Sequence, residues 1–264
     1  MLERRVATNG VVYYASPLLE RAGVPHAFAT RIGGVSPVPF DSLNLGNPSE
    51  GDARDDWDRI HENYRRLQQA IGWSGRERAW VHQVHGGDVA EARLAANEFC
   101  SGARADAIVG DDPQRLLAVR VADCVPVLVT TDDGRVVAAI HAGWRGVVAR
   151  VIPNAIKKLP DARTLMAAIG PCIGYDAFEV GPEVLDAFNE AFGSDAPVRR
   201  NENGKGHADL RQAVRLQLVR AGLSPNRIDT TDLCTHRDAG EFFSHRRDRG
   251  VTGRMAAVIA PRAA

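Results

Sequence analysis

Hydrophobic and polar residues follow one another along this chain with two different periods, which predict strands in some segments and helices in others. Apolar, β-branched runs bounded by glycine, proline or polar turn residues are typical of strands. The segments with this pattern are residues 10–15, 26–30, 78–85, 116–122, 125–131, 135–140 and 255–260. Apolar residues spaced three and four apart predict helices at 53–71, 147–159, 182–192 and 209–221, the second with Pro153 at a kink or boundary.

Hairpins alternate with helices in this order of elements, which predicts an α/β or α+β fold with a mixed sheet rather than a strictly alternating barrel. Two segments are expected to lack regular structure. Residues 31–40 form a loop rich in Gly and Pro that is suited to holding a ligand, and residues 194–206 are polar enough for a mobile surface loop. A chain of 264 residues is short enough for a single domain spanning 1–264.

The dipeptide Asp133-Gly134 joins two of the apolar runs and predicts a tight β-hairpin. With these two residues in the turn, the register of the hairpin places His141 opposite Pro126. Because proline has no N–H for the ladder, regular pairing should end near this point. Cys124 and His141 are therefore expected to lie close together at the open end of the hairpin.

A second histidine is expected near this pair, from the run RAWVHQVH. In a strand over 78–85, His82 and His85 lie on opposite faces, so only one of them faces a given site. One cysteine and two histidines are a donor set that zinc accepts, and three protein ligands leave a fourth position open for water. The sequence thus predicts a catalytic zinc site. Copper is less favoured, because the three methionines lie far from the hairpin in sequence.

A second interpretation needs no metal: His141 activates the Cys124 thiol as a nucleophile, as in cysteine hydrolases. HAGWRG, residues 141–146, adds Arg145 in a glycine-flanked turn at a helix start, as a candidate partner for phosphate or carboxylate. GPCIG, residues 170–174, places Cys172 in a tight turn. FFSHRRD, residues 242–248, combines two aromatic residues with basic groups that can stack on a base or bind phosphate.

Charge and composition exclude several classes of protein. Lys plus Arg and Asp plus Glu both number 33, so no overall field attracts a nucleic acid. The first 30 residues lack a signal-peptide pattern and no apolar window of 18 residues occurs, so we expect a cytoplasmic protein without a membrane partner. The four cysteines, at 100, 124, 172 and 234, are widely spaced, which favours reduced thiols over disulfides. Dinucleotide-binding, P-loop and zinc nucleobase-deaminase motifs are all absent from the sequence.

Seven motifs of this chain together resemble those of one family. They are TRIGGVS (30–36), NLG (44–46), HQVHG (82–86), ADC (122–124), HAGWRG, GPCIG and FFSHRRD. The family is the YfiH/YlmD family, also called the laccase-domain or multicopper polyphenol oxidase family, and it includes purine nucleoside phosphorylases and a peptidoglycan editing factor. The motifs follow the family's order from about residue 26 to the C-terminus.

The resemblance implies a single-domain layered α/β sandwich with mixed β-sheets flanked by helices, and a zinc site. The implied zinc ligands are His85, Cys124 and His141, which selects His85 over His82. The resemblance also implies that Arg31, Asn44, Cys172 and the Arg246 region line the same cleft. The candidate catalytic residues are then Cys124, His141 and Cys172, and the candidate substrate-binding residues are Arg31, Asn44, Arg145 and Arg246. Family members often carry Tyr where this chain has His245.

The activities ascribed to proteins that this chain resembles are phosphorolysis of adenosine, inosine, guanosine and methylthioadenosine, together with adenosine deamination. Hydrolysis of a wrongly built muropeptide precursor and copper-dependent oxidation of phenols are the alternatives. Oxidation ranks last because laccase chemistry needs several copper ions and many clustered histidines, whereas the eight histidines of this chain are spread along its length. We therefore expect a small nucleoside and phosphate as ligands, held by arginines such as Arg31 or Arg145.

Overall fold

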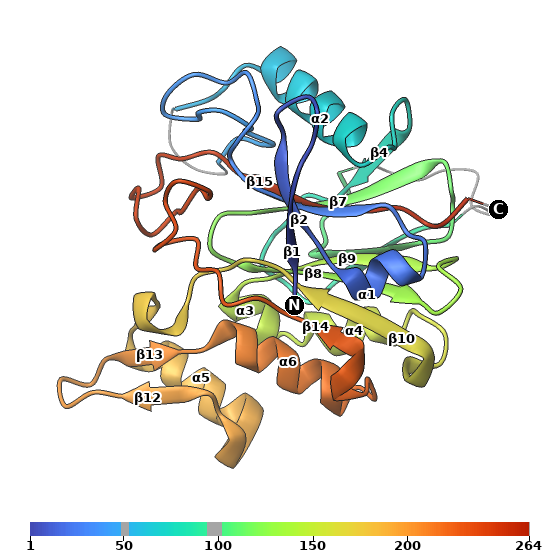
Figure 1. Ribbon diagram of the computed structural model, residues 1–264. Helices are drawn as coiled ribbons and strands as arrows, with labels where there is room; N and C mark the ends of the chain where they lie inside the picture. The colour runs from blue at the N-terminus through green and yellow to red at the C-terminus, as the bar shows by residue number, and fades with distance from the viewer. Residues whose placement is uncertain (49–52, 94–101, 264) are drawn as a thin grey trace.

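The computed structural model describes residues 1–48, 53–93 and 102–263, and its main body is two six-stranded sheets packed face to face (Figure 1). The first sheet has the order β1 (Glu3–Val6), β2 (Val12–Ala15), β3 (His26–Ala29), β15 (Met255–Ile259), β7 (Arg115–Val121), β4 (Glu77–Trp80). The second has the order β14 (Ile228–Asp229), β10 (Leu165–Ile169), β8 (Val125–Thr131), β9 (Val137–Ala142), β6 (Ala107–Gly110), β5 (Val89–Ala92). The pairs β4/β7, β5/β6 and β10/β14 are parallel and the others antiparallel, so the predicted mixed sheets are confirmed.

Helices cover the outer faces of the two sheets, which confirms the predicted layered α/β sandwich. Helix α2 (Trp57–Ala70) packs on the first sheet, and α3 (Trp144–Val148), α4 (Val151–Ile156), α5 (Pro182–Phe192) and α6 (Leu210–Arg220) lie on the side of the second. The short α1 (Pro17–Arg21) follows β2. A third sheet, in the order β11 (Glu179–Val180), β13 (Gly206–Ala208), β12 (Val198–Arg200), projects beside α5 (Figure 1).

Three apolar cores fill the spaces between these layers. The central core lies between the sheets, where Val119 and Ala257 of the first meet Leu128 and Ala139 of the second. These residues are at most 1% exposed, and burial of apolar surface on this scale is the main source of stability of such a fold. The other two cores join each sheet to its helices.

The β8–β9 hairpin has the predicted register. Val125 pairs with Ala142, and Pro126 lies opposite His141. Regular pairing ends at Thr130 and Val137, so the turn around Gly134, whose φ is 72°, is wider than two residues. The hairpin therefore brings the residues before β8 and at the end of β9 to one edge of the second sheet.

Three predicted elements differ from the structure. The strand expected at 78–85 ends at Trp80, since the chain leaves the sheet before it reaches His85, whose φ is 60°. The helix expected at 147–159 is two helices, α3 and α4, divided at Arg150 by a left-handed φ of 65°. The loop expected at 194–206 instead contains β12 and the first residue of β13.

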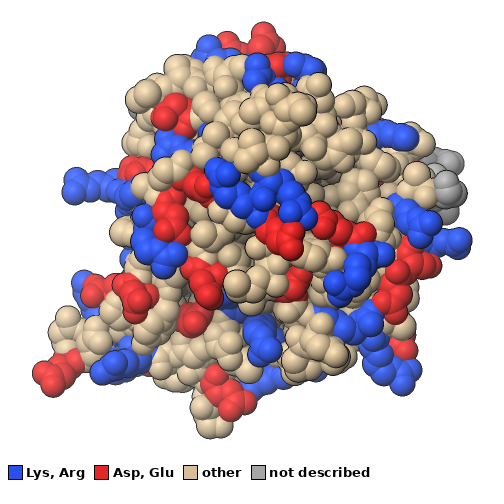
Figure 2. Space-filling view, in the orientation of Figure 1, with Lys and Arg blue, Asp and Glu red and all other residues tan. Residues whose placement is uncertain are grey.

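Charged side chains are mixed by sign on the face in Figure 2, where Lys and Arg lie among Asp and Glu. No helix within the described ranges is both long and apolar enough to cross a membrane. Cys100 lies outside the described residues.

Candidate functional site

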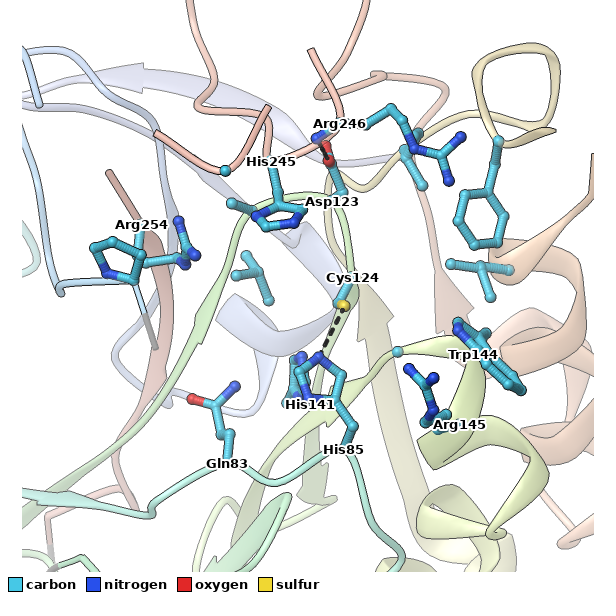
Figure 3. Close-up of a pocket in the computed structure, with 18 of the residues that line it drawn as sticks. Gln83, His85, Asp123, Cys124, His141, Trp144, Arg145, His245, Arg246 and Arg254 are labelled. Carbon is cyan, nitrogen blue, oxygen red and sulfur yellow. Dashed lines mark hydrogen bonds between the residues drawn. The ribbon is translucent and has the colours of Figure 1, made fainter. Parts of the chain in front are cut away.

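His85, Cys124 and His141 converge at the edge of the second sheet (Figure 3). Their ligand atoms all lie within 4.8 Å of one another, and Cys124 Sγ is 3.9 Å from His85 Nε2. The two imidazole rings meet edge to face with their centroids 4.9 Å apart. Among the residues that the structure describes, no other group of three or more His, Cys, Asp or Glu side chains is close enough to share a metal ion.

Local backbone geometry explains why these three side chains meet. Cys124 follows Asp123, whose φ of 93° reverses the chain between β7 and β8, and His141 lies on β9 at the open end of the hairpin. The chain then passes the ligands at Gly143, where an added Cβ would lie 3.0 Å from Cys124 Sγ and 2.9 Å from His85 Cδ2. Only glycine fits so close to the donor atoms.

The buried carboxylate of Asp106 holds both histidines in place. Its Oδ1 accepts a hydrogen bond from His141 Nδ1 at 2.8 Å and another from the His85 backbone N–H at 2.9 Å. Its Oδ2 accepts the backbone N–H groups of Val84 and Gly86, so successive amides of the His85 loop surround one carboxylate. Because Nδ1 of His141 donates to Asp106, its Nε2 is the atom left to bind a metal.

Cys124 and His141 shift each other's titration. Burial would raise the pKa of the Cys124 thiol, but the charge of His141 and hydrogen bonds from His141 and His85 outweigh it and lower this pKa to about 6. Burial would lower the pKa of His141, but the Cys124 thiolate and Asp106 outweigh it and raise this pKa to about 9. The pair therefore favours a thiolate, which is the form of cysteine that binds metals and attacks carbonyl carbons.

The donor set fits zinc. One thiolate and two imidazoles are borderline-soft ligands, and an oriented second partner such as Asp106 is typical of histidines that bind this metal. His85 is exposed and Cys124 half-buried, so the ligand atoms face a cleft rather than a closed interior. Three protein donors beside a cleft are the arrangement of a catalytic rather than a purely structural zinc site.

The cleft has a volume of about 930 Å³, and its two ends differ in character. Gln83 and Arg254 lie on one side of Cys124, and Trp144 and Arg145 on the other (Figure 3). The second side also has apolar walls: Ile173, Phe178, Val180, Val184 and Leu210. The cleft thus has arginines at both ends and aromatic rings at one of them, with the candidate metal ligands between the two ends. We call the end with Gln83 and Arg254 the cationic end and the end with Trp144 the aromatic end.

Two of the predicted substrate-binding residues line the cleft. The Arg145 guanidinium stacks on the ring of Trp144, with Cζ 4.4 Å from the ring centroid. Arg246 covers Phe178 at 5.3 Å, and its Nη1 donates to the Glu179 carbonyl at 2.8 Å. Its backbone N–H donates to Asp123 Oδ2 at 2.7 Å, which fastens the FFSHRRD segment beside Cys124.

Arg31 and Asn44 are not among the residues that line the cleft. The Arg31 guanidinium pairs with Asp41 at 3.0 Å and lies over Phe243, so it supports the 31–47 segment from within. Asn44 is fully buried, and its Oδ1 accepts the backbone N–H of Arg254 at 2.9 Å. Asn44 therefore positions a cleft residue instead of contacting the ligand itself.

Cys172 does not line the cleft either. Its side chain is fully buried beside Cys234, and burial raises the pKa of its thiol to about 11. A thiol in that state is a poor nucleophile near neutral pH. The neighbouring Ile173 is the residue of GPCIG that reaches the cleft.

Several cleft or supporting residues were missing from the sequence-based prediction: Gln83, Arg120, Arg254, Phe178 and Asp106. Gln83 lies within HQVHG, and Asp106 directly precedes the buried strand β6, which were usable signals. Arg120 lies on β7 and Arg254 directly precedes β15, 134 positions later in the sequence, and nothing local to either marks a shared site.

Residues 25–262 match the family model described as multi-copper polyphenol oxidoreductase laccase. The chain belongs to this family. Within the laccase-like family, the chain is 40% identical over 238 residues to the purine nucleoside phosphorylase YfiH of Escherichia coli, covering 90% of this chain and 93% of that protein. It is 37% identical to a purine nucleoside phosphorylase of Deinococcus radiodurans, with 92% of each chain covered.

Solved structures agree with this membership. The crystal structure of YlmD from Geobacillus stearothermophilus has a TM-score of 0.86 and 31% sequence identity, and the match covers 98% of this chain and 99% of that one. The similarity therefore extends over the whole sandwich and includes the elements that carry His85, Cys124 and His141.

Proposed function

We propose that this chain is a zinc-dependent purine nucleoside phosphorylase that acts on adenosine, inosine, guanosine and methylthioadenosine and also deaminates adenosine. The observation that carries the proposal is the convergence of His85, Cys124 and His141 between a cationic and an aromatic end of one cleft. The two relatives are named purine nucleoside phosphorylases, and their names support the same activity. The match with this chain covers more than nine-tenths of the length of each relative.

The aromatic end suits a purine. Trp144 and Phe178 offer rings, and aromatic rings stack on heterocyclic bases. Arg145 and Arg246 back these rings and carry donors for the carbonyl or hydroxyl groups of a nucleoside. In this arrangement the base lies between the rings and the ribose points toward Cys124.

Phosphorolysis forms a bond between a phosphate oxygen and the anomeric carbon of the ribose while the bond from that carbon to the purine nitrogen breaks. The base leaves with a proton on that nitrogen or on another ring nitrogen. Arginine side chains hold the attacking phosphate and offset its charge. Deamination replaces the amino group of adenosine with an oxygen from water and releases ammonia.

His85, Cys124 and His141 would hold the zinc ion, with Asp106 fixing the orientation of His141. A zinc ion at this point supplies a Lewis acid within the cleft. The chain's own contribution is to hold the nucleoside and phosphate in line and to keep the thiolate of Cys124 available as a ligand.

A second candidate is a cysteine-type or metal-dependent amidase that edits peptidoglycan precursors. The observation that favours it is the lowered pKa of Cys124 beside His141, which also describes a thiolate nucleophile paired with an imidazole. A copper-dependent oxidase is disfavoured, because the described residues hold one candidate ligand cluster rather than several.

Chromatography of adenosine and inosine after incubation with the purified protein tests the proposal. We expect free base to appear only when phosphate is present, and inosine to appear from adenosine. A chelator should abolish both products and added zinc should restore them. Absence of both products from zinc-loaded protein would contradict the proposal and turn attention to cell-wall precursors.

Cys124→Ala separates the metal and thiolate interpretations. Loss of both zinc and turnover in a folded variant supports the zinc site. Retained zinc with lost turnover favours the nucleophile, and unfolding of the variant would instead indicate a structural metal. Zinc content is measured by elemental analysis and folding by circular dichroism.

A further inference from the structure

Two arginines, Arg120 and Arg254, lie at the cationic end of the cleft beside Gln83. We propose that these two guanidinium groups form the binding site for inorganic phosphate, the second substrate of the reaction. The inference rests on the proposed phosphorolysis, and it assigns phosphate to residues other than Arg31 and Arg145.

The sheet register brings the two arginines together. In the antiparallel pairing of β7 with β15, Ala256 lies opposite Arg120. Arg254 directly precedes β15, two residues before Ala256, and both arginines line the same cleft. Diagonal neighbours of this kind lie about 7–8 Å apart, a separation that lets two long side chains converge on one small ligand.

Neither guanidinium has a carboxylate partner in the described part of the chain. Arg254 Nη1 donates to the carbonyls of Thr252 and Gly253, each at 3.0 Å. Arg120 Cζ lies over the ring of Trp80, 5.8 Å from its centroid. Most other arginines of this protein that reach the same depth pair with Asp or Glu, as Arg31 does with Asp41.

The two positive charges repel each other. Both arginines are half-buried, and their side chains line one cleft. Holding like charges together in a partly desolvated cleft costs free energy unless an anion lies between them. A phosphate with two negative charges offsets both guanidinium groups, and its oxygens match their planar forks of donors.

Both arginines are held in place through their backbones. Gln83 Nε2 donates to the Arg120 carbonyl at 2.7 Å, and Gln83 Oε1 accepts the Arg120 N–H at 2.8 Å, so this side chain takes the place of a strand partner where β4 has ended. Asn44 Oδ1 accepts the N–H of Arg254. Gly46 lets the Arg120 stem pass, since an added Cβ would lie 2.7 Å from Arg120 Cδ. Such fixed donors lose little freedom when they bind an anion.

The position relative to the candidate zinc ligands also fits a co-substrate. Arg254 and Cys124 line the same cleft. Phosphate at the arginine pair and a purine at Trp144 and Phe178 would leave the ribose between them, beside Cys124 (Figure 3). This order along the cleft is the one that phosphorolysis needs.

The test compares wild-type protein with Arg120→Gln and Arg254→Gln, all full-length and zinc-loaded. Isothermal titration with inorganic phosphate gives the affinity, and steady-state kinetics give the KM values for phosphate and for inosine. We expect each variant to bind phosphate at least about tenfold more weakly, because each loses hydrogen bonds between charged groups, with the inosine KM changed by less than about twofold. Arg120→Lys, which keeps the charge without the fork, should give an intermediate loss and guards against misfolding of the glutamine variants.

Two control variants make the result specific. Arg199→Gln removes one exposed charge on β12, away from the cleft, and should leave phosphate binding unchanged. Arg145→Gln should raise the KM for inosine without changing the affinity for phosphate. The inference is overturned if Arg145→Gln weakens phosphate binding while Arg120→Gln and Arg254→Gln do not.

The outcomes also separate this inference from the proposed activity. Phosphate binding that depends on both arginines, in a protein that cleaves no nucleoside, would support the anion site and contradict the phosphorylase. Phosphorolysis with an unchanged phosphate KM in both variants would support the phosphorylase and contradict the anion site at Arg120 and Arg254. A parallel titration with ribose 5-phosphate checks the source of the phosphate group, and binding of this ester without binding of inorganic phosphate would overturn the inference.

Discussion

Asp106 and His141 are joined twice: the His141 ring donates to the Asp106 carboxylate at 2.8 Å, and the His141 backbone N–H donates to the Asp106 carbonyl, also at 2.8 Å. The same carboxylate accepts three amide N–H groups from residues 84–86. One residue therefore sets the tautomer of one candidate zinc ligand and the backbone of another.

We expect Asp106→Asn to weaken zinc binding by about 10–100-fold, because an amide has a single acceptor oxygen for four donors. Competition with a chromogenic chelator measures the affinity, and the visible spectrum of the cobalt-substituted protein reports the ligand geometry. Asp229→Asn is the control, since this carboxylate accepts hydrogen bonds from Ser16 and Leu18, which lie outside the cleft. Equal zinc affinity in wild type and Asp106→Asn would show that Asp106 does not position the ligands.

Gly143→Ala should disturb the same site by adding a methyl group next to the ligand side chains. Its φ of −74° suits any residue, so the only obstacle is the contact of the new methyl group with Cys124 and His85. We expect a loss of zinc affinity and a destabilisation of about 1–3 kcal/mol, as for other overpacked sites. Denaturant unfolding and chelator competition measure the two effects. Gly240→Ala, where nothing lies within 4 Å, should change neither.

Cys172→Ala should leave zinc content and turnover close to wild type. The side chain is buried outside the cleft, so its loss should cost stability of about 1 kcal/mol and not chemistry. Steady-state kinetics beside a denaturant titration separate the two. A fall in turnover of more than about tenfold, in a variant that keeps its stability, would restore Cys172 as a catalytic residue.

His26 gives the protein a pH-dependent stability outside the site. Its Nε2 accepts the Ser16 N–H at 2.8 Å, so its Nδ1 donates to the Val24 carbonyl at 2.9 Å, and the bond from Ser16 needs the neutral ring. Burial lowers the pKa of His26, although the Val24 carbonyl opposes it. The unfolded chain therefore binds the proton first as the pH falls, and the stability contributed by His26 is complete above about pH 6.5 and declines below it.

The corresponding variant is His26→Gln. Its free energy of unfolding at pH 7.5 should be lower by about 1–3 kcal/mol, because buried groups lose a hydrogen-bond partner. The decline between pH 7.5 and pH 5.5 should be smaller than in wild type. His61→Gln, on the exposed side of α2, should keep the wild-type decline. An identical decline in His26→Gln and wild type would assign the pH dependence to other groups.

Local sequence patterns predicted those helices and strands that are determined by residues close together in the sequence. The Asp133-Gly134 turn and the alternation around it sufficed for the β8–β9 register, and hence for the meeting of Cys124 with His141. Helices α5 and α6 were likewise predicted from their spacing and from the glycines that follow them. Pro153 predicted a kink or boundary in the segment 147–159, and the break lies three residues before it; the left-handed backbone of Arg150 itself was not predicted, because Arg150 is not a glycine.

Features that depend on contacts between distant segments could not be predicted in this way. The Arg120–Arg254 pair exists only because β7 and β15 are neighbours, and the role of Asn44 depends on the same sheet. The resemblance to the family selected His85 over His82. Alternation along a strand could not have done so, because the strand ends at Trp80, before either histidine. The resemblance did not show that Arg31 and Cys172 lie outside the cleft lining, since a motif can be shared for its packing as well as for its contact with a ligand.

Phe178, which directly precedes β11, Val180 of β11 and Val184 of α5 line the aromatic end of the cleft. All three candidate zinc ligands, by contrast, belong to the two-sheet sandwich. Selection can therefore remodel one wall of the cleft without disturbing the donor atoms on the other. A family built in this manner is able to diverge in the compounds it accepts while keeping the three candidate ligands unchanged, and an exchange of residues 178–208 between two members is the direct way to transfer a preference from one to the other.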